Sequence, residues 1–196
     1  MSRQEAWWEG VGGDDYLTRN RIAWGTRTPF WARILPRFQP VDILEVGCNL
    51  GANLLAIRSL KEYPFGRLCG ADINDKAIRE AWKASLTVDK CAAIDLLDHY
   101  GPKQFDLVFT SGVLIHVPPK EILRVMSQIK QVSRRYVLAI EYADKLEVEV
   151  TYRGEKELLW RRPYGALYDA MNLNLVEEGE AEGFDRCHYW LCERLL

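Results

Sequence analysis

The chain lacks the long apolar stretches of membrane-spanning and secreted proteins. No window approaches the ~18 uninterrupted apolar residues of a membrane-spanning helix. The opening residues, MSRQEAWWEG, lack the apolar core of a secretory signal. We therefore expect no membrane partner and a cytoplasmic location.

Cysteine and histidine are also sparse. The five cysteines form no C-x-x-C pair, lie mostly within apolar runs and are odd in number, which favours reduced packing residues over disulfides. The three histidines are too scattered in sequence to suggest a metal cage. We expect no bound metal.

The chain has no strong charge of either sign, because 26 Lys and Arg stand against 28 Asp and Glu. A net charge of -2 gives no general attraction to nucleic acid or to anionic membranes. No Pro/Ser-rich linker divides the 196 residues, and 48% of them are hydrophobic. We expect one domain, residues 1–196, with a well-buried core.

Short apolar segments alternate with helical patterns over the first three quarters of the chain. Buried strands are predicted at residues 42–46, 67–71, 91–94, 105–110 and 136–141. Helices are predicted at 51–60, at 75–85 with Asn74 as the cap, and at 119–133. Such alternation predicts an α/β fold, a parallel sheet with helices on both faces.

The pattern changes at both ends of this core, residues 39–142. After it, residues 145–152 alternate apolar and charged residues, and residues 162–171 resemble a helix opened by Pro163. The last two strand-like runs, 173–180 and 188–195, predict an antiparallel hairpin at a sheet edge. Together, residues 143–196 form a substrate-side insert and an antiparallel edge. Before the core, residues 1–38 are rich in Trp, Arg and Tyr, look helical from about residue 14, and are expected to form a lid.

The stretch Gly47-Cys48-Asn49-Leu50-Gly51 breaks the first strand from the helix that follows. A buried strand that enters a helix through such a turn leaves backbone N–H groups at the carboxyl edge of the sheet, which suits a nucleotide. Gly47 permits the tight turn, and Gly51 allows close approach to a ligand. Asn49 stands where another glycine is common, but Asn tolerates a positive φ. A plain strand-to-helix turn is the alternative.

Acidic residues follow the next two predicted strands. Asp72 lies about 20 residues beyond the glycine turn, where a carboxylate can accept hydrogen bonds from both ribose hydroxyls. Asp95 follows the third predicted strand, where it could contact an adenine amine. The alternatives are a helix cap for Asp72 and a solvated turn for Asp95.

Together these residues resemble the class I S-adenosylmethionine-dependent methyltransferases. EVGCNLG, from Glu45 to Gly51, is similar to their first motif, E-x-G-x-G-x-G, and FDLVFTSGVLIHVPP is similar to their fourth. The terminal antiparallel pair also matches, whereas nicotinamide-binding Rossmann domains normally lack it. The resemblance implies S-adenosylmethionine as the cofactor and a Rossmann-like fold with a seven-stranded, mostly parallel sheet and an antiparallel last strand.

A closer resemblance concerns three segments: GGDDYLTRN, GVLIHVPP and YVLAIEYADKLEVEVTYRGEKELLWRRPYG. They are similar to segments of small methyltransferases associated with pseudaminic acid biosynthesis. The chain departs from that subfamily after Leu175, where the segment before the final strand is shorter and lacks an acid-rich loop. The departure leaves the acceptor open.

The resemblance implies a set of site residues. Tyr16 and Arg19 would hold the methionine carboxylate, with Arg supplying forked donors. The other implied cofactor contacts are Glu45, Gly47, Cys48, Asn49, Gly51, Asp72, Ile73, Asp95, Leu96 and Thr110.

On the acceptor side, His116 follows the fourth strand and has a near-neutral pKa that suits a general base. Glu141, at the end of the fifth strand, is the second catalytic candidate. Tyr142, Tyr152 and Arg153 are the candidate substrate-binding residues, and Arg153 would suit an acidic acceptor. The alternatives are a structural histidine in a turn, a helix-capping Glu141 and a hairpin that bends at Gly154.

The sequence thus predicts a methyltransferase that acts on a small polar acceptor, such as a sugar or nucleotide-sugar, with oxygen preferred over nitrogen. A nucleic-acid or protein methyltransferase is the main alternative, although no N/D-P-P-Y/F sequence follows the fourth strand. A non-catalytic S-adenosylmethionine-binding module would show a damaged glycine turn or no ribose acid. A nicotinamide oxidoreductase is the third alternative. We expect a monomer or a homodimer.

Overall fold

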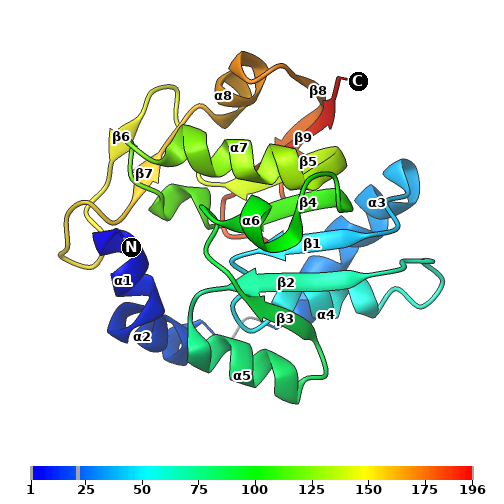
Figure 1. The fold of residues 1–196 in the computed structure, drawn as a ribbon, viewed down its shortest axis with the longest axis horizontal. Helices are drawn as coiled ribbons and strands as arrows, with labels where there is room; N and C mark the ends of the chain where they lie inside the picture. Colours follow the sequence, from blue (N-terminus) through cyan, green and yellow to red (C-terminus); the bar gives the residue numbers. More distant parts are fainter. Residues whose placement is uncertain (1, 21–22, 196) are drawn as a thin grey trace.

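A seven-stranded sheet crosses the centre of the molecule, in the order β3-β2-β1-β4-β5-β9-β8 (Figure 1). The computed structural model describes residues 2–20 and 23–195, so the predicted lid and the C-terminal segment each include positions outside the described residues. The strands are β1 Ile43–Val46, β2 Leu68–Asp72, β3 Thr87–Lys90, β4 Phe105–Ser111, β5 Ser133–Glu141, β8 Leu173–Glu180 and β9 His188–Arg194. Strands β1 to β5 are parallel, whereas β9 runs antiparallel to both neighbours. The predicted fold class is confirmed.

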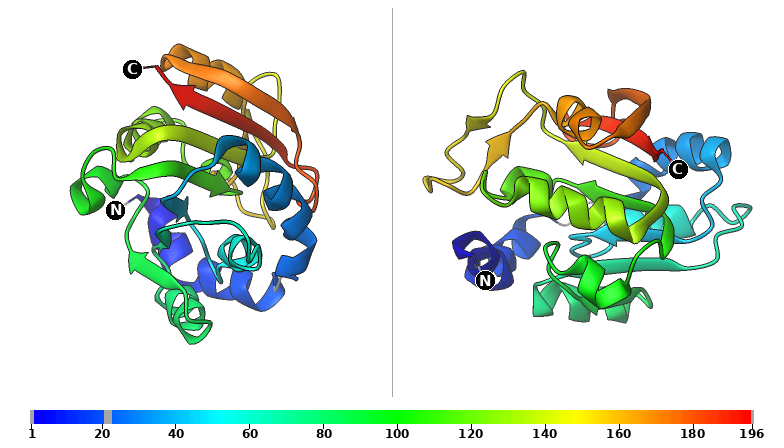
Figure 2. Two further views of the ribbon diagram at one scale, coloured as in Figure 1. Left: turned by 90° about the vertical axis from the view of Figure 1, so that its right-hand side faces the viewer. Right: turned by 45° about the horizontal axis from the view of Figure 1, so that its top comes forward.

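Helices cover both faces of the sheet (Figures 1 and 2). They are α1 Arg3–Glu9, α2 Val11–Arg19, η1 Trp24–Arg27, α3 Thr28–Phe38, α4 Ala52–Arg58, α5 Asp75–Lys83, α6 Leu96–Tyr100, η2 Leu114–His116, α7 Ile122–Val132 and α8 Tyr164–Ala170. Along β1, Leu44 and Val46 pack toward α7 and α8, while Ile43 packs toward α3 and α4. The alternation of side chains along a strand therefore builds two separate cores. Over residues 2–20 and 23–195, no helix combines the length and apolarity required to cross a membrane.

Most elements lie where the sequence predicts them. The predicted helices at 51–60, 75–85 and 119–133 correspond to α4, α5 and α7, and the side chain of Asn74 accepts a hydrogen bond from Ala77 N at 2.8 Å, as a cap should. Pro163 precedes α8, and β8 and β9 form the predicted antiparallel edge. The predictions of helix 162–171 and of the terminal hairpin are confirmed.

The third strand is the main error of the prediction. It spans Thr87–Lys90, and the apolar run at 91–94 forms the turn after it. Because β3 is an edge strand, only Val88 among its four residues is buried. A half-exposed edge strand needs few apolar residues. The apolar pattern of the sequence therefore placed the strand at the neighbouring residues 91–94.

The segment after β5 forms a small second sheet of β6 Val148–Glu149 and β7 Trp160–Arg161. The alternating segment at 145–152 therefore contributes only two strand residues. Beyond it, Tyr152 and Glu155 exchange both backbone hydrogen bonds, and Arg153 and Gly154 have φ values of 53° and 85°. Positive φ at both central residues is typical of a type I′ hairpin turn.

The N-terminal helices α1 and α2 lie between the start of α5 and this hairpin (Figure 1). The Asn74 side chain donates to Trp8 O and Glu9 O at 3.3 and 3.1 Å, and Gln4 Nε2 donates to Glu157 O at 3.0 Å. A Cβ at Gly13 would lie 2.0 Å from Trp8 O, so only glycine permits this packing. The sequence predicted helix only from about residue 14 and missed α1.

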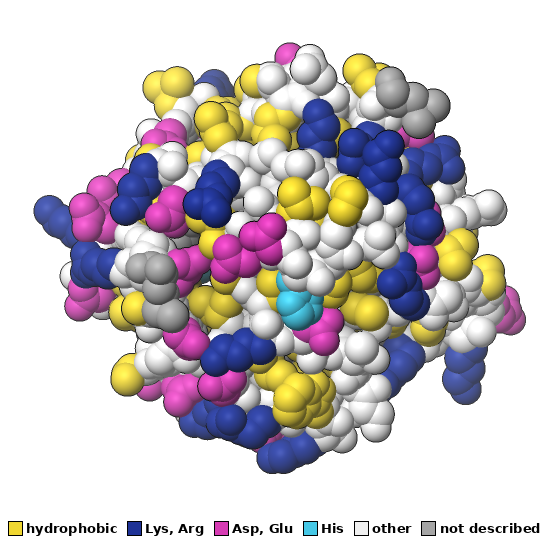
Figure 3. All heavy atoms as spheres, in the orientation of Figure 1, with side chains coloured by type: hydrophobic (Ala, Val, Ile, Leu, Met, Phe, Trp, Pro, Cys, Tyr) yellow, Lys and Arg dark blue, Asp and Glu magenta, His cyan; other side chains and the backbone are white. Residues whose placement is uncertain are grey.

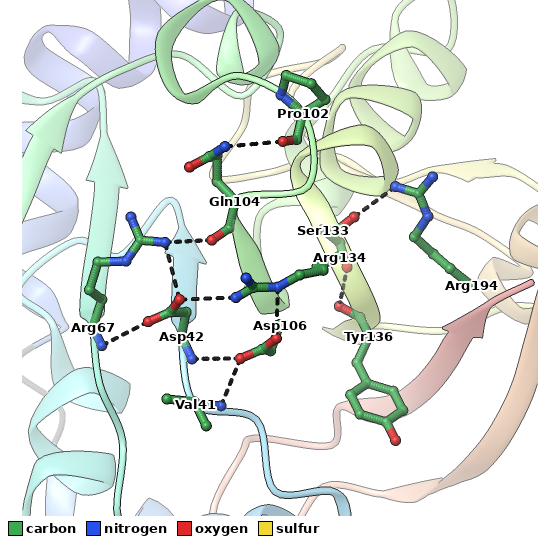
Figure 4. Close-up of polar contacts among 10 residues, drawn as sticks. All are labelled: Val41, Asp42, Arg67, Pro102, Gln104, Asp106, Ser133, Arg134, Tyr136 and Arg194. Atoms are coloured by element: carbon green, nitrogen blue, oxygen red, sulfur yellow. Dashed lines mark hydrogen bonds and ion pairs between the residues drawn. The ribbon is translucent and has the colours of Figure 1, made fainter. Parts of the chain in front are cut away.

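A polar network joins the amino ends of the central strands (Figure 4). Asp42, before β1, pairs with Arg67 at 3.2 Å and Arg134 at 2.9 Å, and Arg134 also pairs with Asp106 at 2.9 Å. The side chains of Arg67 and Arg134 are about half exposed, at 51% and 46%. Each ion pair therefore contributes at most about 1 kcal/mol to the free energy of unfolding. The network fixes strand register at this edge and leaves the opposite edge for the cavity.

Candidate active site

A cavity of about 590 Å³ lies at the carboxyl ends of β1 to β4, beneath α1 and α2. Its walls come from the turns after those strands, and its roof includes Trp8, Tyr16 and Leu17. This edge of a parallel sheet is where open α/β folds bind ligands. The volume is within the about 300–1,000 Å³ typical of small-molecule sites.

The glycine turn adopts the predicted strained backbone. Gly47, Asn49 and Gly51 have φ values of 69°, 50° and 74°. A Cβ at Gly47 would lie 2.4 Å from a methyl group of Val113. One at Gly51 would lie 2.2 Å from a methyl group of Leu86, so Gly51 makes room for packing and does not itself line the cavity. The expectation that Asn49 tolerates a positive φ is confirmed.

Asp72 joins this turn to the end of β2. Its carboxylate accepts hydrogen bonds from Asn49 N at 2.7 Å and from Asn74 N at 2.9 Å, and it lines the cavity beside Gly47, Cys48 and Asn49. Burial raises its pKa. Two backbone donors occupy only part of the hydrogen-bonding capacity of a carboxylate. Asp72 can therefore hold the turn and still accept bonds from a ligand.

Glu45 and Arg27 form a second polar group in the cavity. Glu45 Oε1 accepts a hydrogen bond from Asn53 at 2.6 Å, whereas Oε2 and the Arg27 Nε are buried without a hydrogen-bond partner among the described residues. Burial raises the pKa of Glu45 to about 8 and lowers that of Arg27. Buried polar atoms without partners are uncommon, which points to a polar ligand here.

The arginine that lines the cavity among the described residues is Arg27 rather than the predicted Arg19. Arg19 is exposed at the end of α2 and does not line the cavity, although Tyr16 does. Burial is the largest cause of a raised Tyr16 pKa. The sequence prediction missed Arg27, whose only signal is its position just before the Thr28-Pro29 helix start.

Two other predicted cofactor contacts, Asp95 and Leu96, lie outside the cavity. Asp95 is exposed, Leu96 is fully buried in the core, and the residues that face the cavity beside Ile73 are 91–94. The shift follows from the misplaced third strand. The apolar run at 91–94 is a cavity wall, which explains its composition.

Thr110 is likewise absent from the cavity wall, because its side chain is fully buried. The next two residues, Ser111 and Gly112, line the cavity instead. Alternation along β4 explains the shift, since successive side chains point to opposite faces of the sheet.

His116 lines the same cavity as the glycine turn. Its Nδ1 lies 2.7 Å from the carbonyl oxygen of Leu158. A carbonyl only accepts, so Nδ1 carries the hydrogen and the Nε2 of the neutral ring has a free lone pair. Its ring centre lies 4.2 Å from that of Trp8, and burial lowers the pKa to about 4. His116 is therefore neutral near pH 7.

Glu141 does not reach the cavity. Its carboxylate accepts hydrogen bonds from the backbone of Val113 and Leu114, both at 3.1 Å, and of Ile115 at 3.4 Å. It is fully buried, which raises its pKa to about 7. The structure thus supports the alternative interpretation, a strand-end carboxylate that caps the η2 turn, and removes Glu141 from the catalytic candidates.

None of the three candidate substrate-binding residues lines the cavity. Tyr142 donates its hydroxyl to Asp185 at 3.2 Å, and Arg153 is exposed in the hairpin turn. Tyr152 packs behind the wall, with its ring centre 5.3 Å from that of His116 and 6.1 Å from that of Trp8. Tyr152 therefore supports the site indirectly.

Residues 44–135 match the family model described as a methyltransferase domain. No curated protein matches the chain. The matched residues include β1 to β4, the glycine turn and His116, and therefore most of the cavity wall.

Solved methyltransferase structures share the whole fold. Magnesium protoporphyrin IX methyltransferase from Synechocystis with bound S-adenosylmethionine superposes with a TM-score of 0.73 at 13% identity, covering 100% of this chain and 99% of that one. The 1,6-didemethyltoxoflavin-N1-methyltransferase of Burkholderia thailandensis gives 0.69 at 14% identity, with 93% and 85% covered. DesVI from Streptomyces venezuelae gives 0.67 at 14% identity, with 94% and 97% covered.

Residues 44–135 thus match a methyltransferase domain, and the chain as a whole has the fold of solved methyltransferases that hold S-adenosylmethionine or S-adenosylhomocysteine.

Proposed function

We propose that the protein transfers a methyl group from S-adenosylmethionine to a hydroxyl oxygen of a small polar acceptor. The observation that supports this most is a single cavity lined by the glycine turn, by Asp72 and by the neutral His116.

The cavity residues fit the nucleoside half of this cofactor. Asp72 would accept hydrogen bonds from the ribose hydroxyls, and Asn49, whose Oδ1 is buried without a partner among the described residues, would supply another acceptor. Ile73 and the apolar residues at 91–94 would pack against the adenine.

The amino acid half fits Glu45 and Arg27. The unpartnered Oε2 of Glu45 would accept from the methionine ammonium, and Arg27 would donate to the carboxylate. Glu45 is buried and Arg27 is partly buried, with its Nε shielded from water, and a zwitterion would supply the opposite charges that they lack. Tyr16, at the same end, would close this part of the site.

The bound cofactor would supply an activated methyl group: the carbon–sulfur bond would break as the oxygen–carbon bond formed, and sulfur would keep the electron pair. The protein aligns the acceptor and holds the proton. His116 Nε2 accepts the hydroxyl hydrogen, and its low pKa suffices because the oxygen becomes strongly acidic as it gains the methyl group. Helices α1 and α2, the proposed lid, exclude water.

The charges of the cavity favour an uncharged acceptor. Besides Arg27, the only Lys or Arg among the described lining residues is Lys76, which pairs with Asp14 at 3.7 Å. The acids of the lining are Glu5, Glu45, Asp72, Glu80 and Glu121. Phosphate groups would meet net negative charge, so a free sugar is favoured over a nucleotide-sugar. The similarity to pseudaminic acid methyltransferases keeps sugars first among the candidates.

The surface does not favour a nucleic-acid substrate. On the face in Figure 3, Lys and Arg side chains lie among Asp and Glu. Arg67 and Arg134 pair with Asp42 and Asp106. Nucleic-acid binding requires unpaired basic side chains along the backbone path.

Calorimetric titration with S-adenosylmethionine and its demethylated product tests the cofactor site. We expect saturable binding that Asp72→Asn weakens at least about tenfold, because a bidentate charged acceptor is lost. Asp98→Asn, on the exposed face of α6, is the matched control. Equal binding by Asp72→Asn would remove the ribose assignment, and no binding by the native protein would contradict the function.

A methyl-labelled cofactor, incubated with free sugars and their nucleotide-linked forms, tests the acceptor. We expect label in a free sugar and at least about a hundredfold loss of turnover in His116→Gln, the order of general-base effects. His99→Gln, exposed on α6, is the control. Transfer only to the nucleotide-linked forms would contradict the charge argument, and full turnover by His116→Gln would contradict the base.

A further inference from the structure

The η2 turn, which carries His116, is held from both sides by buried charged side chains. Glu141 accepts hydrogen bonds from its backbone N–H groups. Arg162 donates to its carbonyls, with Nη1 at 2.8 Å from Leu114 O and Nη2 at 2.7 Å from Val117 O. The three residues of the turn therefore have little freedom to move.

Arg162 is a buried arginine whose guanidinium makes three hydrogen bonds. It is only 1% exposed, and its Nε lies 2.6 Å from a carboxylate oxygen of Glu147, which is half exposed. A fully buried arginine is costly unless its donors are all paired. Here the two Nη atoms of the guanidinium donate to the carbonyls of η2 and its cap, and Nε donates to Glu147 near the start of the insert.

The same segment also holds the His116 ring. Leu158, whose carbonyl accepts from Nδ1 at 2.7 Å, precedes Arg162 by four residues, with β7 between them. One strand thus contacts η2 twice, through a carbonyl at one end and a guanidinium at the other. Any shift of this strand relative to η2 would change both contacts together.

We propose that Arg162 is a positioning residue: it locks the strand of the insert onto η2, so that the Leu158 carbonyl holds His116 as the Nδ1–H tautomer with Nε2 free toward the cavity. The effect of Arg162 on catalysis rests on the proposed function, whereas its effect on the tautomer of His116 does not. Without Arg162, the carbonyls of Leu114 and Val117 lose their donors in a buried site, and the turn must move to find others.

Nitrogen NMR of histidine-labelled protein measures the tautomer without any acceptor or cofactor. The chain has three histidines, so His99 and His188 serve as internal references. We expect the native protein to show His116 as the Nδ1–H form alone. In Arg162→Gln we expect a mixture with the Nε2–H form, and in Arg162→Lys, which keeps one donor to the carbonyls, a smaller change. Arg161→Gln, exposed on the adjacent residue, should leave the spectrum unchanged.

Two results would overturn the proposal: an Nε2–H form in the native protein, or an unchanged spectrum in a folded Arg162→Gln. If Arg162→Gln does not fold, the spectra of Arg162→Lys and Arg161→Gln are compared instead. Identical spectra for these two variants would overturn the proposal. Arg162 does not line the cavity, so the affinity of each variant for the cofactor should stay within about twofold of the native value. An unchanged affinity reports that the fold is intact.

With an acceptor in hand, kcat of Arg162→Gln should fall at least about tenfold, as expected for a displaced general base. Cofactor affinity should not change. A failure of the methyltransferase proposal would appear as absent cofactor binding in the native protein. A failure of this inference would appear as an unchanged tautomer in the variant, so the two are distinguishable.

Discussion

The contact between Gly47 and Val113 couples the glycine turn to the η2 turn, and Gly47→Ala tests it. Two penalties add. A non-glycine residue at a φ of 69° costs about 1–2 kcal/mol. The new Cβ, 2.4 Å from the Val113 methyl group, adds about 1–3 kcal/mol of overpacking. We therefore expect Gly47→Ala to lower the free energy of unfolding by about 2–5 kcal/mol.

Gly112→Ala is the matched control, because Gly112 has a similar φ of 67° but its Cβ would have no described atom within 4 Å. It should cost only the backbone penalty of about 1–2 kcal/mol. Urea unfolding of the variants gives the difference. In the Gly47→Ala background, Val113→Ala should recover stability, and the double-mutant cycle isolates the contact. Equal losses in Gly47→Ala and Gly112→Ala, together with no recovery, would refute the steric reasoning.

Two further predictions concern the buried acid and the lid. Burial raises the pKa of Glu45 to about 8 from 4.5, so the folded protein keeps this proton longer than the unfolded chain, and the cofactor-free protein should lose stability as the pH rises from about 4.5 to about 8. Thermal unfolding of Glu45→Gln should depend less on pH over this window, and parallel curves for the variant and the native protein would argue against a buried titrating Glu45. Gly13→Ala, whose Cβ would lie 2.0 Å from Trp8 O, should loosen α1 and α2, with faster amide hydrogen exchange over residues 3–19 and weaker cofactor binding. Gly25→Ala, whose Cβ would have no described neighbour within 4 Å, is its control, and equal exchange in both variants would show that the lid does not depend on this close packing.

The order of elements could be predicted because the strands at the centre of the sheet are mostly buried and therefore mostly apolar. Edge strand β3 shows the limit. Its sequence, TVDK, has one buried residue, while the adjacent apolar run, CAAI, lines a ligand cavity. An apolar run indicates burial, and a cavity wall buries residues as a strand does.

The local motifs of the site were predictable for a similar reason. The glycine turn depends on its own backbone, and Asp72 depends on its place at the end of a strand; both lie where the sequence indicated. The identities of partners were not predictable. Glu141 accepts hydrogen bonds from backbone N–H groups 26 to 28 residues before it in the chain, and Arg27, rather than Arg19, lines the cavity. Such pairings depend on tertiary packing.

The insert, residues 143–163, has a consequence for attempts to change the acceptor. Two consecutive residues of the insert hold other parts of the site. The carbonyl of Glu157 accepts a hydrogen bond from Gln4 of α1, and the carbonyl of Leu158 accepts one from the His116 ring. Grafting this stretch from another enzyme would disturb the roof of the cavity and the His116 ring in one step. An exchange that keeps the enzyme active has to transfer the first helix with it, as a matched pair.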